Sequence, residues 1–99
     1  MSTKPLTLVV TFQARPGKEA ELRKVLTALV APSRKDAGCL NYDLHVALDD
    51  PAKFIFHENW ATKAHHEAHV AAPHIQALLP RIDELCVGFP TITMCERID

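Results

Sequence analysis

Residues 38–60 read Gly-Cys-Leu-Asn-Tyr-Asp-Leu-His-Val-Ala-Leu-Asp-Asp-Pro-Ala-Lys-Phe-Ile-Phe-His-Glu-Asn-Trp, and this stretch decides the fold. Its two halves, 39–47 and 53–60, are rich in apolar and aromatic residues, as β-strands are. The Asp-Asp-Pro sequence at 49–51 lies between them and favours a turn. The stretch therefore predicts two antiparallel strands joined by a turn, and its polar side chains suggest a binding or reactive site.

The segment before this strand pair predicts a strand followed by an amphipathic helix. Residues 6–13 are mostly apolar or β-branched, which is typical of a strand. Pro32 should kink the helix or end it early, and Gly38 is a suitable stop before the next strand. The apolar residues that recur at helical spacing are Leu22, Val25, Leu26, Leu29 and Val30.

The segment after the strand pair predicts short helices and a last strand. Thr62 can cap a helix that runs to about Val70, and Pro73 can begin another at a position that tolerates proline. Pro80 argues against a single straight helix in this region. Residues 91–97 alternate in polarity and predict the last strand. The helical apolar positions here are Ile75, Leu78, Leu79, Ile82 and Leu85.

The order β-α-β-β-α-β over residues 1–99 predicts a single α+β domain of the ferredoxin-like type, with a four-stranded antiparallel sheet and helices on one face. Apolar residues occupy both faces of the strand at 53–60, because Phe56 and Trp60 lie on one face and Ile55 on the other. An apolar face without helices needs a second layer. We therefore predict a homodimer whose sheets pack face to face as a dimeric α/β barrel.

Composition excludes several classes of protein. The net charge of −1 gives no electrostatic signature for nucleic acid or an anionic membrane, and no stretch approaches the roughly 20 apolar residues of a membrane span. Residues 1–5 lack an apolar signal core, so a cytoplasmic location is expected. The three cysteines show neither a disulfide framework nor zinc-ligand spacing. They are Cys39, Cys86 and Cys95.

Glu58 is the strongest candidate for a catalytic residue. A carboxyl between Phe56 and Trp60 on an apolar face should be desolvated, which raises its pKa toward the range of a useful general base or acid. The alternative is a structural acceptor for a backbone or arginine donor. His45 is the second candidate base because imidazole titrates near neutrality, although a half-exposed histidine near a turn is an equally simple interpretation.

Other aromatic and histidine side chains are candidates for substrate binding. Trp60 can stack on a flat aromatic substrate or simply fill the core. Tyr42 can donate a hydrogen bond to a substrate oxygen or to a backbone carbonyl. Tyr42 and His45 have opposite parity, so a regular strand cannot direct both into one cavity, whereas a β-bulge could. The other candidates are Phe56 as an aromatic wall, His69 near the entrance, His66, and His74 as a hydrogen-bonding residue at a helix start.

The histidines at 65–69 also raise the question of a metal site. His65 and His69 are spaced i, i+4, which places them on one helical face. No H-E-x-x-H motif is present, and a third ligand would have to come from elsewhere in the chain. We therefore expect no metal.

Several motifs together resemble the antibiotic biosynthesis monooxygenase domain family, and they cover nearly the whole chain. The resemblance implies a ferredoxin-like fold assembled as a dimeric barrel and, in some members, oxidation of quinols or polyphenols without a cofactor. Relatives usually have a leucine-like residue where this chain has His66, and a non-proline at Pro80. The motifs are Arg15-Pro16-Gly17-Lys18, Gly38-Cys39-Leu40-x-Tyr42-Asp43-Leu44-His45, Asp49-Asp50-Pro51-x-x-Phe54, Glu58-x-Trp60, Ala68-His69 and Pro73-His74.

The resemblance leads to an enzyme as the first hypothesis. The chain is expected to be a monooxygenase without cofactors that oxidises a small quinol or polyphenol with O2, using Glu58 or His45 as the base. One alternative is an isomerase acting on a small hydroxy-carbonyl signalling metabolite. The other is a non-catalytic dimeric protein that binds a small ligand. All three predict a small-molecule partner, a homodimer, and no nucleic acid or membrane partner.

Overall fold

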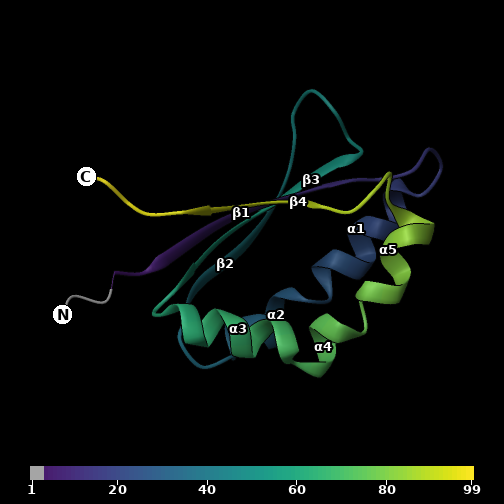
Figure 1. Cartoon of the computed structure of the whole chain (residues 1–99). Coiled ribbons are helices and arrows are strands. Elements are labelled where there is room, and N and C mark those ends of the chain that lie inside the picture. The colour runs from purple at the N-terminus through teal and green to yellow at the C-terminus, as the bar shows by residue number, and fades with distance from the viewer. Residues whose placement is uncertain (1–3) are drawn as a thin grey trace.

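One antiparallel sheet with helices on a single face organises the chain (Figure 1). The computed structural model describes residues 4–99. Residues 1–3, which belong to the segment 1–5 where no signal core was expected, lie outside the described residues. The strands β1 (Leu6–Gln13), β2 (Cys39–Val46), β3 (Lys53–Trp60) and β4 (Thr91–Cys95) pair in the order β2-β3-β1-β4. The helices are α1 (Glu19–Thr27), α2 (Val30–Arg34), α3 (Lys63–Ala71), α4 (Pro73–Gln76) and α5 (Leu79–Leu85). The predicted α+β ferredoxin-like fold is confirmed.

The strands fall close to their predicted bounds. β1 and β3 cover the predicted residues, and β2 ends at Val46, one residue early. β4 ends at Cys95 instead of Arg97. Continuing the β1–β4 register, in which Thr7 is opposite Cys95, would place Arg97 opposite Pro5. Because proline has no backbone N–H to donate, the ladder stops before that pair.

Both predicted helical regions are divided by proline. The first breaks between α1 and α2, ahead of Pro32, and the last breaks between α4 and α5, ahead of Pro80. A proline inside a helix cannot donate to the carbonyl four residues earlier, so the break falls on that earlier turn. Thr62 caps α3 as predicted, because its side chain accepts from the His65 N–H at 3.2 Å. Pro73 occupies the first turn of α4, as expected.

Gly38 connects α2 to β2 at a point where a larger residue does not fit. Its φ is +79°, and a Cβ added there would lie 2.2 Å from the His65 ring. The left-handed backbone and the close approach of α3 both favour glycine. Gly38 thereby brings the start of β2 against α3, the helix that carries three of the histidines.

The core lies between the sheet and the helices. On the sheet it consists of alternate residues of β1 and β3, and on the helices of their inward apolar positions. β4 is an edge strand, and its Ile92 and Met94 remain 48% and 55% exposed on the same side as the core. The core residues from β1 and β3 are Leu8, Val10, Phe12, Phe54, Phe56 and Trp60, Tyr42 of β2 joins them, and those from α1 and α5 are Leu22, Leu26, Ile82 and Leu85.

The helix-free face of the sheet is less apolar than predicted. Val9 and Ile55 lie on this face, but their neighbours are threonine, asparagine and histidine. The prediction of two largely apolar faces is therefore only partly right, because the edge strand β2 alternates polar and apolar residues. Within residues 4–99, no helix is both long enough and apolar enough to span a bilayer.

Candidate active site

Strand β3 carries the centre of the candidate site. Phe56, Glu58 and Trp60 point toward the helices on alternate positions, as predicted, and all three are buried. Glu58 is only 4% exposed. Tyr42 of β2 lies directly opposite Glu58 in the β2–β3 register and faces the same way. The two strands thus place a carboxyl and a phenol side by side beneath the helices.

Glu58 is a buried acid whose hydrogen-bond donor is an indole. The Trp60 Nε1–H donates to Glu58 Oε1 at 2.9 Å, and no salt bridge to Glu58 is formed within residues 4–99. Burial raises the pKa of Glu58, and the hydrogen bond from Trp60 opposes that rise only in part. The donor to Glu58 is thus a tryptophan and not the arginine or backbone group considered from the sequence. Burial is the main cause of the raised pKa of Glu58, as the sequence analysis expected.

A small apolar pocket lies next to this carboxyl, between the sheet and the helices. Its volume is about 140 Å³. Glu58, His69 and the Tyr42 ring contribute the titratable groups of its wall. The other lining residues are almost all apolar: Val10, Phe12, Leu29, Phe56, Val70, Ile75, Leu78, Leu79, Ile82, Phe89, Pro90 and Ile92. Among them Phe89 is 67% exposed and Val70 40%, so the pocket opens on their side.

Tyr42 supplies a protonated phenol to the pocket. Its side chain is 2% exposed and packs on the Phe56 ring, with centroids 4.6 Å apart. Burial raises the pKa of Tyr42, and the nearby Glu58 carboxylate raises it further. Tyr42 therefore keeps its proton at neutral pH and can act as a hydrogen-bond donor.

His69 enters the pocket from α3 and is held from behind by Asp36. Its Nδ1 lies 2.8 Å from Asp36 Oδ2, and the Nε2 of His74 lies 3.0 Å from the same oxygen. The His69 ring stacks on Trp60, with centroids 4.4 Å apart. Burial lowers the pKa of His69, while the hydrogen bond and charge of Asp36 act in the opposite direction. The net effect favours a neutral imidazole.

His66 lies one turn before His69 and is also turned inward. It is 9% exposed, and its ring centroid is 6.1 Å from that of Trp60. Burial lowers the pKa of His66, and the neighbouring His69 lowers it further. His66 does not line the pocket; it packs behind it, against Trp60.

The structure brings some of the predicted site residues together and separates others. Glu58, Tyr42, Phe56 and His69 line one pocket. The remaining candidates do not line that pocket: Trp60 and His66 pack behind it, and His74 meets the pocket residue His69 edge-on and shares Asp36 with it. The β2 bulge falls between Cys39 and Asn41, before Tyr42. Tyr42 and His45 therefore keep opposite directions.

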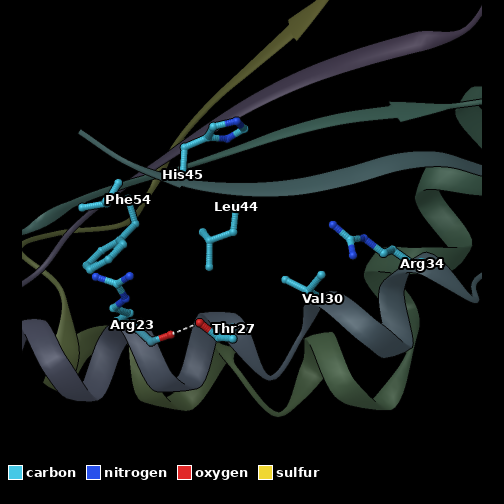
Figure 2. Close-up of a pocket in the computed structure, with 8 residues that line it drawn as sticks. Arg23, Thr27, Val30, Arg34, Leu44, His45 and Phe54 are labelled. Atoms are coloured by element: carbon cyan, nitrogen blue, oxygen red, sulfur yellow. Dashed lines mark hydrogen bonds between the residues drawn. The ribbon is translucent and has the colours of Figure 1, made fainter. Parts of the chain in front are cut away.

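His45 belongs to a different hollow, shown in Figure 2. This second pocket has a volume of about 320 Å³ and lies between β2 and the helices α1 and α2. Leu44 and Phe54 point toward the helices, whereas the exposed His45 ring points away from them (Figure 2). The other lining residues are Arg23, Thr27, Val30, Arg34 and Val46. His45 thus has no geometric connection with Glu58.

The fold brings together three side chains that could hold a metal ion, and they differ from the set considered in the sequence. The side-chain ligand atoms of Asp36, His69 and His74 all lie within 4.8 Å of one another. Two imidazoles and one carboxylate are donors that suit a divalent transition metal. His65 does not join them, because its Nδ1 lies 2.8 Å from the Thr62 hydroxyl. The atoms of the set are already joined by hydrogen bonds, which account for their positions without an ion.

Asp36 is the site residue that the sequence interpretation did not find. It lies in the connection between α2 and β2, separated by 33 residues from His69 and by 38 from His74. No local spacing links an acid to histidines at such distances. The available signal was its position two residues before Gly38, whose turn brings this connection against α3.

Comparison with known proteins places this chain in a family. The model of the family described as "Antibiotic biosynthesis monooxygenase" matches residues 5–81. The Mycobacterium tuberculosis protein named "Putative monooxygenase Rv0793" is 27% identical over 97 residues, which are 98% of this chain and 95% of that protein. Because the family model covers most of the sequence, the chain belongs to the antibiotic biosynthesis monooxygenase family.

Solved structures agree with this assignment. The crystal structure of PA3566 from Pseudomonas aeruginosa has a TM-score of 0.94 and 36% sequence identity, covering 100% of this chain and 99% of that one. The structure of Rv0793 from Mycobacterium tuberculosis has a TM-score of 0.91 and 25% identity, with 97% of each chain covered. Both support the ferredoxin-like fold over the full described length.

Proposed function

We propose that the protein is a cofactor-independent monooxygenase that oxidises a small quinol or polyphenol with O2 in the pocket beside Glu58. The observation that carries this proposal is a buried carboxyl, without a charged partner in the described chain, at the wall of an apolar pocket. A buried acid with a raised pKa and a specific donor is typical of a functional group. Family membership supports oxygen chemistry as the use of that group.

The size of the pocket favours a substrate with one aromatic ring. Its volume is about 140 Å³, and an engineered apolar cavity of roughly 150 Å³ binds benzene. Phe56 and Tyr42 supply aromatic walls for such a ring. A larger, polycyclic substrate would have to extend through the mouth, past Phe89.

The proposed reaction balances without any cofactor. A hydroquinone and one O2 give a hydroxyquinone and one water, so the substrate supplies all four electrons. One oxygen atom is added to the ring and the other leaves as water. Glu58 accepts a phenolic proton, which makes the ring electron-rich enough to reduce O2, and later returns the proton to the oxygen that leaves. Tyr42 donates a hydrogen bond to a substrate oxygen.

Oxygen consumption by the purified protein tests the proposal. Protein treated with chelator and free of flavin should consume O2 and form quinone with at least one hydroquinone or catechol of a monocyclic panel. Glu58→Gln should lower kcat by about 10²-fold or more, the usual contribution of a general base. His57→Gln, an exposed change on the helix-free face, is the matched control and should leave kcat unchanged.

Other results would reject the proposal or its assignment of the base. An activity lost in His45→Ala but kept in Glu58→Gln would move the base to the second pocket. Turnover of a hydroxy-carbonyl compound without O2 would favour the isomerase, and tight ligand binding without turnover would favour the binding protein. The absence of O2 consumption across the whole panel would reject oxidation of this substrate class.

We further infer that the protein forms a homodimer. Apolar side chains lie outside the core at two places: Val9 and Ile55 are half-buried on the helix-free face, and Ile92 and Met94 are exposed on β4. Uncovered apolar area of this kind is usually buried in an interface. Analytical ultracentrifugation of Ile55→Lys and Ile92→Lys should show which patch weakens the dimer. A wild-type protein that remains monomeric at a concentration of about 100 μM would contradict the inference.

A further inference from the structure

We infer that Asp36 fixes His69 in the tautomer whose Nε2 lone pair faces the pocket, so that His69 is a second proton acceptor there. His74 shares the same Asp36 oxygen and holds the carboxylate in place. The use of His69 in catalysis depends on the proposed function, whereas its tautomer and orientation do not. Asp36 acts through His69 and is therefore a positioning residue.

The hydrogen bonds determine the tautomer. Oδ2 of Asp36 lies 2.8 Å from His69 Nδ1 and 3.0 Å from His74 Nε2. An ionised carboxylate only accepts, so both ring nitrogens must carry the hydrogen. A neutral imidazole with a hydrogen on Nδ1 has its lone pair on Nε2. That nitrogen has no hydrogen-bond partner within residues 4–99, and His69 lines the pocket.

The surroundings fix the direction of the ring. Trp60 stacks against His69 with an interplanar angle of 34°, and Tyr42 meets it edge-on at 5.3 Å between centroids. His69 is 4% exposed, so few other rotamers have room. The other titratable groups around it are His66, with its centroid at 6.1 Å, and His74 at 5.9 Å.

Two proton acceptors match a substrate with two ionisable hydroxyls. Glu58 and His69 both line the pocket, from β3 and from α3. One hydroxyl of the quinol gives its proton to Glu58 and the other to His69 Nε2. Both protons return to the reduced oxygen atom, which leaves as water, while O2 takes the four electrons of the substrate. The imidazolium formed in between is paired with Asp36, whose carboxylate is already in contact with the ring.

Histidine NMR tests the tautomer without any turnover. In 15N-labelled full-length protein treated with chelator, His69 should show a protonated Nδ1 and an unprotonated Nε2. Asp36→Asn should abolish the preference for this tautomer, because an amide can donate as well as accept. Asp43→Asn, which changes a carboxylate that pairs with Arg34 and accepts from Asn41 away from the pocket, is the matched control. A wild-type His69 with its hydrogen on Nε2 would overturn the inference.

A phenol probe tests whether Nε2 faces the pocket. Addition of 4-nitrophenol should shift the His69 Nε2 resonance and leave that of His57, on the opposite face, in place. The affinity should fall in Asp36→Asn. Should Asp36→Asn fold poorly, His74→Gln keeps the Asp36–His69 contact and serves as the second variant, with a weaker effect in the same direction. Binding of the probe without any change at His69 would contradict the orientation.

Kinetics separates a catalytic from a structural role once a substrate is found. Asp36→Asn should lower kcat by about 10²-fold with little change in KM. It should also move the acid limb of the kcat profile to lower pH, because Asp36 raises the pKa of His69. An unchanged kcat and an unmoved limb would show that His69 is not the acceptor. If the wild type showed the predicted His69 tautomer but no monooxygenase activity, the proposed function would be refuted and the assignment of the tautomer would stand.

Stoichiometric Zn²⁺ binding would also decide against the inference. If added Zn²⁺ displaced the His69 Nδ1 hydrogen at a ratio of one ion per chain, the three residues would be a metal site. The same titration on His74→Gln distinguishes this from surface binding, since loss of one ligand should abolish a real site.

Discussion

Replacing Glu58 by glutamine should make the protein less sensitive to rising pH. Glu58 is 4% exposed, and burial raises its pKa above the ordinary value of 4.5. Between 4.5 and its raised pKa the folded chain keeps a proton that the unfolded chain has lost. Stability therefore falls as pH rises through this window. Below it, both states are protonated and Glu58 has no effect on the slope.

The size of the effect follows from proton linkage. One extra proton in the folded state changes the free energy of unfolding by about 1.4 kcal/mol per pH unit. Glu58→Gln removes this term and keeps a carbonyl that can accept from Trp60 Nε1. The difference in stability between variant and wild type should thus grow with pH above 4.5 and level off once pH passes the pKa of folded Glu58.

Urea unfolding between about pH 4 and pH 8 measures this difference. Trp60 is the single tryptophan of the chain and reports the transition by fluorescence. Protein concentration must be constant, because a dimer would make the midpoint concentration-dependent. Glu84→Gln is the contrasting control: Arg81 lowers the pKa of the exposed Glu84, so its removal should give a small difference of opposite sign. Parallel curves for wild type and Glu58→Gln would refute the reasoning.

Three further substitutions test other parts of the site. Trp60→Phe removes the only donor to Glu58 found within residues 4–99 and should cost about 1–3 kcal/mol, measured by thermal unfolding monitored by circular dichroism; an unchanged midpoint would exclude a structural role for this hydrogen bond. His66→Leu removes a buried imidazole whose pKa burial lowers below 6.5. As pH falls below 6.5, the unfolded chain binds a proton at His66 before the folded chain does, which favours unfolding. Wild type should therefore lose more stability than this variant when pH falls from 6.5 toward about 5, and equal losses in urea unfolding would contradict this. Gly38→Ala places a Cβ 2.2 Å from the His65 ring at a φ of +79°, so it should destabilise by more than about 1 kcal/mol; a variant as stable as wild type would show that α3 moves freely at this point.

The sequence predicted the fold well because local patterns decided it. The alternation of buried and outward residues in β3 predicted a strand and its buried face. The helical spacing of apolar residues after Gly17 predicted the helical region and its buried face. The prolines were recognised as breaks, but not the position of each break, because that position depends on which carbonyl loses its donor. The apolar character of the helix-free face was overestimated, since β2 contributes Asn41, Asp43 and His45 to it.

The site was predicted only where it follows strand parity. Glu58, Phe56 and Tyr42 share a face because of their positions in β2 and β3, and parity also separated Tyr42 from His45. Asp36 could not be found in this way. Its contact with His69 arises from the packing of the α2–β2 connection against α3, which no local pattern encodes.

Burial acts in opposite directions on the two proton acceptors of the pocket. It raises the pKa of Glu58, which makes the Glu58 carboxylate a stronger base, and it lowers the pKa of His69, which keeps the imidazole neutral and free to accept a proton. An uncharged aromatic substrate then enters without the dehydration of an ion. Transfer of its proton to His69 creates a phenolate and an imidazolium in an apolar site, where the opposite charges attract each other more strongly than in water. Asp36 stabilises the imidazolium that forms when His69 accepts a proton, and Trp60 and Tyr42 hold Glu58 and His69 in place. An exposed histidine such as His45 offers none of these conditions, which is why we assign the chemistry to the pocket beneath the helices.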